Sequence, residues 1–141
     1  MRPSSGFQYT LRALVDLALH QATGPVTVNK IAKRQEIPLR YLEQLFNRLR
    51  RHGLVVAERG PRGGYRLSRH PAQIPVSEIF QSVELKGLSP APSHADPARA
   101  LWGQVEQAVQ TTLEATTLET LLAQARAHSP ATFPHRYTFH I

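Results

Sequence analysis

At 141 residues with 41% hydrophobic residues, the chain is long enough to fold as one globular domain with a substantial core. It has no cysteine, which excludes disulfides, thiolate metal sites and a cysteine nucleophile. It also lacks the apolar run of about 18 residues that a transmembrane helix needs, and Arg12 and Asp16 interrupt the stretch that could serve as a signal peptide, so a cytoplasmic protein is expected.

The net charge of +7 is unevenly distributed along the chain. Residues 1–71 hold thirteen Lys and Arg against four Asp and Glu, a balance of +9, whereas residues 72–141 hold four against six, a balance of −2. A basic half of this kind is typical of a protein that binds a polyanion. An anionic membrane surface could attract the same charge, but the most basic stretch, residues 39–52, lacks a large aromatic face that would enter lipid.

Apolar residues at helical spacing predict a first helix over residues 7–21. After a Gly24-Pro25 loop, Thr27 is placed to cap a second, short helix. The basic side chains of that helix are expected to face outward: Lys30, Lys33 and Arg34.

A third helix is predicted over residues 39–52, ended by Gly53. Its buried stripe is Leu42, Leu45, Phe46 and Leu49. The opposite arc carries Arg40, Glu43, Gln44, Asn47 and Arg51, with Arg48 and Arg50 on its flanks. With the Glu36-Ile37-Pro38 turn before it, this helix takes the recognition position of a helix-turn-helix, where such side chains meet base edges and phosphates.

A β-hairpin is predicted next, with one strand from Leu54 to Val56 and another from Tyr65 to Leu67. Its turn, RGPRGG, holds Arg59, Gly60, Pro61 and Arg62, so that glycines allow close backbone approach to a phosphate and arginines supply charge. Taken alone, the basic helix would ordinarily be explained as a solvated helix, and the hairpin as a plain turn. Together and in this order they favour a winged helix-turn-helix that contacts nucleic acid.

The second half of the chain is predicted to hold a short helix over 76–83, a Pro-rich loop over 85–97 and a long helix over 98–115. Thr116 and Glu119 have the spacing of a capping box for a last helix through residue 127, and residues 133–141 are expected to form an edge strand or to be disordered. The long helix could pack on its own domain, but we favour a contact with a second copy. Its expected dimerisation residues are Leu101, Trp102, Val105, Val109 and Leu113.

The run YLEQLFNRLRRHGLVVAERGPRGGYRL resembles the signature of the Rrf2-type (IscR/NsrR/CymR) family of winged helix-turn-helix transcriptional regulators. Further matching runs are YTLRALVDLALH, VSEIFQSVE and ALWGQVEQAVQTTLEATTLETLL. The resemblance implies a homodimer that binds an imperfect palindrome in double-stranded DNA. It places Leu39, Arg40, Glu43, Gln44 and Arg48 at the major groove, with Glu43 accepting from a cytosine amino group, and Arg59 to Arg62 at the minor groove. The full set of expected DNA contacts is Thr27, Leu39, Arg40, Tyr41, Glu43, Gln44, Arg48, Arg51, Arg59, Gly60, Pro61, Arg62 and Tyr65.

Many members of that family hold an iron–sulfur cluster on three cysteines, but the corresponding loop here, residues 85–99, has none. In some members the first helix adds a ligand, and the residues here are Gln8 and Arg12, which are poor ligands. No cofactor is therefore expected. His94 and Asp96 are at most a weak metal site, and a solvated loop is the better interpretation, as it is for His135 and His140.

The predicted fold is mainly α with a small β-hairpin wing. Its parts are a winged helix-turn-helix domain over 1–84, the loop over 85–97, dimerisation helices over 98–128 and a tail over 129–141. The predicted function is a dimeric DNA-binding transcriptional regulator without enzyme activity. Its DNA binding is expected to be controlled by an unidentified small molecule or protein, or to need no effector. Two alternatives are a protein–protein interaction module and a metal or redox sensor with histidine and carboxylate ligands.

Overall fold

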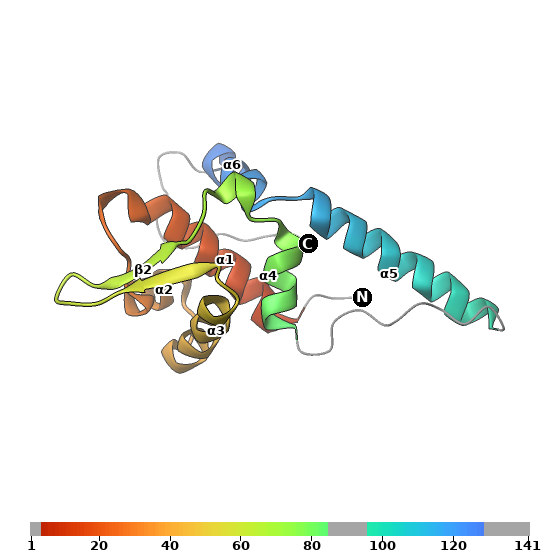
Figure 1. Ribbon diagram of the computed structural model, residues 1–141, viewed down its shortest axis with the longest axis horizontal. Coiled ribbons are helices and arrows are strands. Elements are labelled where there is room, and N and C mark those ends of the chain that lie inside the picture. Colours follow the sequence, from red (N-terminus) through yellow and green to blue (C-terminus); the bar gives the residue numbers. More distant parts are fainter. Residues whose placement is uncertain (1–3, 85–95, 129–141) are drawn as a thin grey trace.

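The computed structural model describes residues 4–84 and 96–128, which form helices and one antiparallel hairpin (Figure 1). In chain order the elements are α1 (Ser5–His20), α2 (Val28–Gln35), α3 (Leu39–Arg51), β1 (Val55–Glu58), β2 (Gly64–Leu67), α4 (Val76–Val83), α5 (Pro97–Ala115) and α6 (Leu118–His128). Short 3₁₀ turns follow α1 at Gln21–Thr23 and precede α4 at Pro71–Gln73. The predicted fold class, mainly α with a hairpin wing and a long C-terminal helix, is confirmed.

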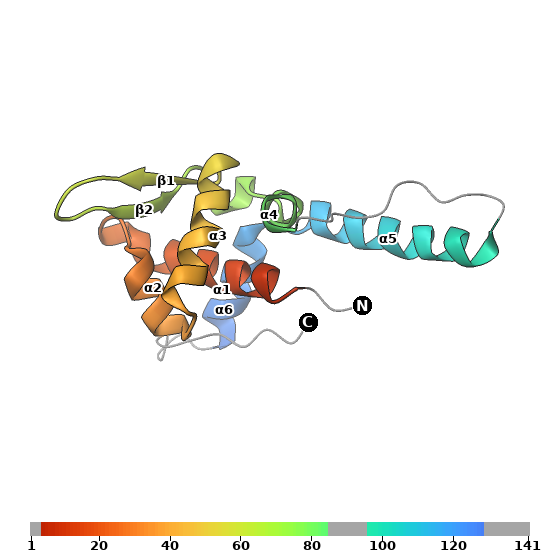
Figure 2. The same ribbon diagram turned by 90° about the horizontal axis from the view of Figure 1, so that it is seen from below.

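Helix α1 lies at the centre of the body, between the helix-turn-helix and α6 (Figures 1 and 2). It begins at Ser5, two residues before the predicted start, because the Ser4 hydroxyl caps it by accepting from the Phe7 N–H at 3.1 Å. Its residues Leu14 and Leu17 are fully buried, in one core that α2, α3, α4 and α6 share. Burial of such side chains, at roughly 25 cal/mol per Å² of apolar surface, is the main term holding these helices together.

The helix-turn-helix forms as predicted. Thr27 caps α2 by accepting from the Lys30 N–H at 3.2 Å, and the turn places Glu36 in the left-handed region with φ of 55°. Helix α3 buries Leu42, Leu45, Phe46 and Leu49, and Pro38 precedes it without a side-chain cap. Gly53, with φ of +73°, follows its C-cap.

Arg34 was expected to face outward from α2, but it turns back onto α1. Its guanidinium donates to both carboxylate oxygens of Asp16, with Nη2 at 2.6 Å from Oδ1 and Nε at 2.9 Å from Oδ2. The Gln35 side-chain amide also donates to Asp16 Oδ2 at 2.9 Å. Because the Asp16 side chain is 1% exposed, its charge has to be paired inside the protein, and this requirement overrides the outward position of Arg34.

The hairpin is anchored to the body at its base. Strands β1 and β2 pair in register Val55↔Leu67 to Glu58↔Gly64, and Tyr65 forms a further bridge with Val26, which precedes α2. The Val26 N–H donates to the Tyr65 carbonyl at 3.0 Å, and the Tyr65 N–H donates back at 2.7 Å. The wing therefore projects from the body at a fixed position beside α3 (Figure 1).

Helix α5 extends away from the body as an arm, and α6 folds back onto α1 (Figures 1 and 2). In α6, Leu118, Leu122 and Ala125 join the core, so this helix completes the body, although the predicted dimerisation region had included it. The boundaries of the predicted domains stay a prediction. The tail from residue 129, with the predicted edge strand, lies outside the described residues.

The predicted capping box at Thr116 and Glu119 is wrong. The Thr116 carbonyl accepts from the Val76 N–H at 2.8 Å, and the Thr116 hydroxyl donates to the Thr112 carbonyl at 2.8 Å. Thr116 is thus extended and tied to the start of α4, and Thr117 instead accepts from the Thr120 N–H at 3.4 Å.

Candidate nucleic-acid interface

The outward face of α3 carries the polar side chains that the sequence placed there. Arg40, Glu43, Gln44 and Arg51 are all exposed, while the apolar stripe is buried below them. Within residues 4–84 and 96–128, none of the ion pairs involves Arg40 or Arg51. Their guanidinium groups can therefore bind an external anion or a base edge without first breaking an internal pair.

Two predicted contact residues face other parts of the protein. Tyr41 is half-buried and packs edge-on against Tyr9 of α1, with ring centroids 5.8 Å apart. Arg48 is half-buried, and its Nη1 donates to the Val83 carbonyl at the end of α4, at 3.3 Å. Both residues lie on the flank of α3 that faces α1 and α4, which makes them supports of the recognition helix in this structure.

The wing tip displays the predicted basic turn. Arg59, Gly60, Pro61 and Arg62 are all exposed between β1 and β2. Nearer the base, Arg66 pairs with Glu58 across the two strands, with Nε at 2.6 Å from Oε1. That pair removes one cation from the wing and leaves Arg59 and Arg62 as the charges at its tip.

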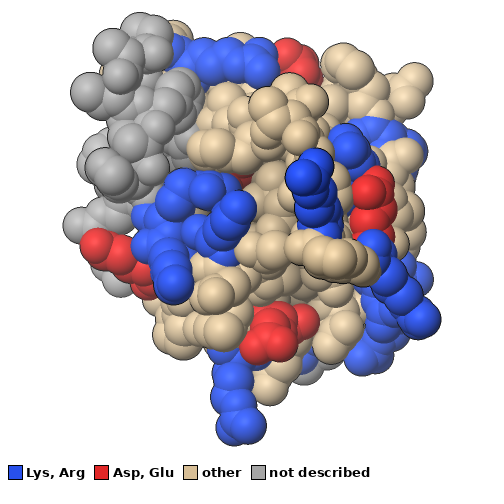
Figure 3. Space-filling model, turned by 90° about the vertical axis from the view of Figure 1, so that its left-hand side faces the viewer, with Lys and Arg blue, Asp and Glu red and all other residues tan. Residues whose placement is uncertain are grey.

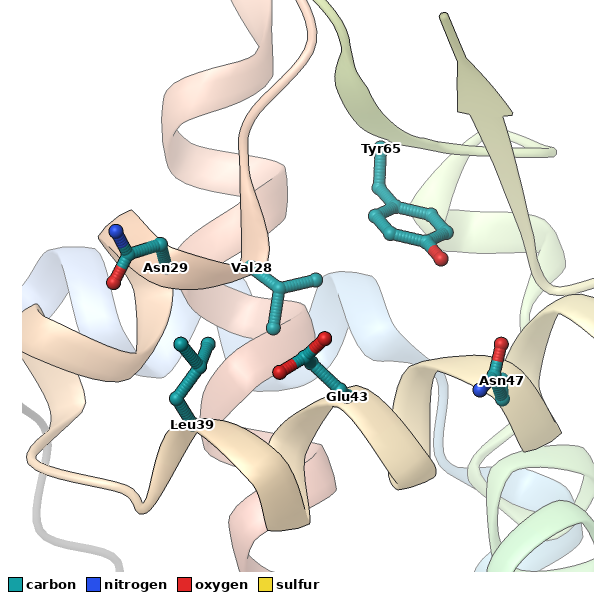
Figure 4. Close-up of a pocket in the computed structure, with 6 residues that line it drawn as sticks. All are labelled: Val28, Asn29, Leu39, Glu43, Asn47 and Tyr65. Atoms are coloured by element: carbon teal, nitrogen blue, oxygen red, sulfur yellow. The ribbon is translucent and has the colours of Figure 1, made fainter.

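A recess of about 270 Å³ separates α3 from the wing and from the start of α2 (Figure 4). Leu39, Glu43 and Asn47 line it from α3, Val28 and Asn29 from α2, and Tyr65 from β2. Tyr65 is held there by its backbone bridge to Val26 and by the Phe46 ring, whose centroid is 5.0 Å from its own. Figure 4 shows the Tyr65 hydroxyl and the Asn47 side chain pointing toward each other, with the Glu43 carboxylate between α3 and Val28.

Val28 and Asn29 were not predicted as contacts, and Asn47 was predicted on the outward arc of the recognition helix but not in the list of expected DNA contacts. A signal for Asn47 was present, because Leu39, Glu43 and Asn47 recur every four residues and so lie along one line of α3. Nothing in the sequence indicated that β2 and α2 would form the other walls of this recess.

Seen from the end that carries the wing, the surface shows Lys and Arg side chains spread over the face, with smaller acidic patches between them (Figure 3). The exposed cations on the helix-turn-helix and wing include Lys30, Lys33, Arg40, Arg59 and Arg62. A face of this kind attracts a polyanion at long range and is screened by salt.

The predicted dimerisation residues lie on the projecting α5. Leu101 and Trp102 are 61% and 50% exposed, which is unusual for side chains of this size. Val105 and Val109 are half-buried, and Leu113 packs against the core of the body. These two exposed side chains, Leu101 and Trp102, belong to the first half of α5, and Figure 2 shows that this end of the helix is the one farther from the body.

The residues present do not fit an iron–sulfur cluster of the thiolate-ligated kind, because the chain has no cysteine. In the two described ranges there is no group of three or more His, Asp and Glu side chains that could hold a metal ion. Asp96 caps α5 by accepting from the Ala98 N–H at 3.0 Å, and His94 lies outside the described residues. No helix in the described part of the chain could cross a membrane.

The chain matches the Rrf2 family model, described as an iron-dependent transcriptional regulator, over residues 3–124. It is 38% identical over 139 residues to slr0846 of Synechocystis, which is named an HTH-type transcriptional regulator, and the match covers 93% of this chain and 94% of that protein. The solved structure of IscR from T. potens is similar with a TM-score of 0.80 and 35% identity, covering 94% of this chain and 93% of that one.

IscR of Sodalis glossinidius is 49% identical over 84 residues, which cover 60% of this chain and 51% of that protein. This match therefore spans about half the length of that relative. The similar proteins are transcriptional regulators and not enzymes, which agrees with the prediction from the sequence.

Proposed function

Since this chain belongs to the Rrf2 family of transcriptional regulators, we propose that two copies of it bind a palindromic DNA operator in a sequence-specific way. Helix α3 would enter the major groove and the wing would reach the minor groove or its phosphates. The observation that carries this proposal is the exposure of Arg40 and Arg51 on the recognition helix and of Arg59 and Arg62 on the wing, none of which forms an ion pair within residues 4–84 and 96–128.

The distribution of contacts follows from the exposure of each side chain. Arg59 and Arg62 at the wing tip are suited to phosphates, whose recognition needs charge and close backbone approach. Glu43 is suited to a base, because a carboxylate would repel a phosphate but accepts from a cytosine amino group. Arg59 and Arg62 would therefore supply affinity for any DNA sequence, and Glu43 would supply the preference for one base.

The exposed apolar half of α5 supports the homodimer. Leu101 and Trp102 would lose their exposure to water when packed against a second copy, and a two-fold axis through such a contact would pair two recognition helices. Helices spaced by one turn of DNA, about 34 Å, bind the two halves of a palindrome. The single-copy alternative, a protein interaction module, would use the same α5 surface for another protein.

The regulator is proposed to work without a cysteine-ligated iron–sulfur cluster, since the chain offers no thiolate. Any signal would then come from a small molecule or a protein partner. Because it acts on chromosomal DNA, the proposed location is the cytoplasm.

The test is DNA binding by the purified protein, titrated against the DNA upstream of its own gene and against a scrambled duplex at two salt concentrations. We expect preference for the native duplex, with affinity falling by roughly one power of salt concentration per phosphate contact. Arg59→Ala and Arg62→Ala should each weaken binding to both duplexes and reduce the salt slope by about one.

Weak binding that is equal for the two duplexes and unaffected by salt would contradict the proposal. Tight, salt-insensitive capture of another protein through α5 would favour the interaction module instead. Native DNA preference with unchanged behaviour of both arginine variants would leave DNA binding in place but reject the assigned role of the wing.

A further inference from the structure

The recess between α3 and the wing contains polar groups that the protein itself leaves without hydrogen bonds. Among residues 4–84 and 96–128, no group donates to or accepts from the Glu43 carboxylate, the Asn47 amide or the Tyr65 hydroxyl. All three come from elements whose positions are set by burial, and they point into the same space (Figure 4). Groups placed in this way are available to an external partner.

The chemistry of the recess selects a base edge over a phosphate. Glu43 carries a negative charge at its centre, which disfavours an anion, whereas adenine and cytosine each bring an amino group that a carboxylate or an amide oxygen can accept from. Leu39 and Val28 add an apolar wall at one end, which suits a thymine methyl group rather than a charge.

The spacing along α3 relates these side chains to the DNA. Leu39, Glu43 and Asn47 are four residues apart, and each step is about 6 Å along a helix that rises 1.5 Å per residue. Neighbouring base pairs are about 3.4 Å apart, so a step of four residues corresponds to slightly less than two base pairs. Glu43 and Asn47 therefore face positions about two base pairs apart if α3 follows the groove.

We propose that Asn47 is a specificity-determining residue that reads an adenine about two base pairs from the position read by Glu43; this rests on the proposed function. A carboxamide both donates and accepts, and it matches the N7 acceptor and the N6 donor of adenine in a bidentate contact. A carboxylate cannot make this pair of bonds, so the two residues read different bases.

Tyr65 serves Asn47 as a positioning residue. Its ring is held against Phe46, with 5.0 Å between centroids, and its hydroxyl points to the Asn47 side chain (Figure 4). Within the described residues no hydrogen bond joins the two groups, so we infer that the hydroxyl bonds one side of the carboxamide when Asn47 turns its other side to the base. The wing thus contributes to the base preference of the recognition helix, in addition to its own contacts.

The experiment is selection of binding sites by the full-length protein from a duplex library with randomised half-sites, followed by titration of the selected duplex and its single-base variants. With the unchanged protein we expect an adenine in each half-site whose replacement weakens binding about 5- to 150-fold. Asn47→Ala should abolish that one preference, and Asn47→Arg should move it to guanine, the base that arginine binds through O6 and N7.

Three further variants separate a base contact from a general effect and test the role of Tyr65. Glu43→Ala should relax a different position, about two base pairs away, and leave the adenine preference unchanged. Arg51→Ala, an exposed cation on the next turn of the same helix, should weaken all duplexes alike and lower the salt slope. Tyr65→Phe should keep overall affinity for scrambled DNA but reduce the adenine preference.

The outcomes distinguish this inference from the proposed function. If the unchanged protein selects a site and Asn47→Ala selects the same site with the same preferences, the role of Asn47 is rejected and DNA binding stands. If Asn47→Ala weakens every duplex equally, Asn47 contacts a phosphate and the inference is again rejected. If the unchanged protein selects nothing, both the inference and the proposed function fail.

Discussion

Gly64 is the residue at which the wing meets the body. A Cβ atom there would lie 2.6 Å from both the carbonyl carbon and the oxygen of Val26, closer than real Cβ contacts come, and its φ of +152° is a conformation that glycine adopts far more easily than other residues. The bridge between Val26 and Tyr65 depends on that close approach. A single missing side chain thus allows the wing to be fixed beside α3.

Gly64→Ala is expected to lower the free energy of unfolding by about 2–4 kcal/mol, because the new methyl group collides with backbone and the strained φ remains. Urea unfolding measures the loss. Gly24→Ala is the matched control, since its φ of +139° is similar but nothing lies within 4 Å of its Cβ, so it should cost only about 1 kcal/mol. Equal losses for the two variants would mean that the contact with Val26 has no energetic role.

At the scale of the elements, α1 and α2 are joined by a buried charge network as well as by apolar packing. Asp16 receives the Arg34 guanidinium and the Gln35 amide, and Arg12 donates to the Gln35 carbonyl. All of these contacts end at the last turn of α2, directly before Glu36 and the turn of the helix-turn-helix. The network therefore sets where α3 begins relative to α1.

Asp16→Ala is expected to destabilise the protein by about 3–5 kcal/mol, because Arg34 then loses the partner of a partly buried charge. The measurement is again urea unfolding, compared with Glu58→Ala. Glu58 pairs with Arg66 at the surface, with side chains 45% and 39% exposed, so removing it should cost less than about 1 kcal/mol. A loss from Asp16→Ala as small as that of the surface pair would show that apolar packing alone orients α2.

At the scale of the whole molecule, the body and the α5 arm have different physical roles. The body buries its apolar side chains within one chain, whereas the far half of α5 leaves Leu101 and Trp102 in contact with water. The proposed homodimer would cover this exposed surface with a second copy of the chain.

Replacing both Leu101 and Trp102 with Glu is expected to leave the body folded and to convert a dimer to a monomer, which sedimentation measures. Affinity for a palindromic duplex should fall by about 100-fold or more, because bivalent binding is lost, while affinity for a single half-site should change little. Gln107→Glu, exposed on the same helix, is the control and should remain dimeric. A double variant that stays dimeric would place the interface elsewhere.

The fold class and most element positions were determined by the sequence, because they depend on local patterns. The stripe of Leu42, Leu45, Phe46 and Leu49 predicts α3 from its spacing alone, and the RGPRGG turn predicts the wing from its backbone requirements. The exposed side of α3 follows from the same spacing, so the positions of Arg40, Glu43 and Gln44 were also predictable.

Only the tertiary structure decided which neighbours those side chains meet. Arg34 turns inward because a buried carboxylate lies on another helix, and Tyr41 and Arg48 pack on α1 and α4. Thr116 is extended because its carbonyl accepts from the N–H of Val76, the first residue of α4. The recess around Asn47 likewise needs α2 and β2 to close it. Periodicity specifies which face of a helix is buried, but the partner across that face comes from a distant part of the chain, where hydrogen bonding and burial of charge make the choice.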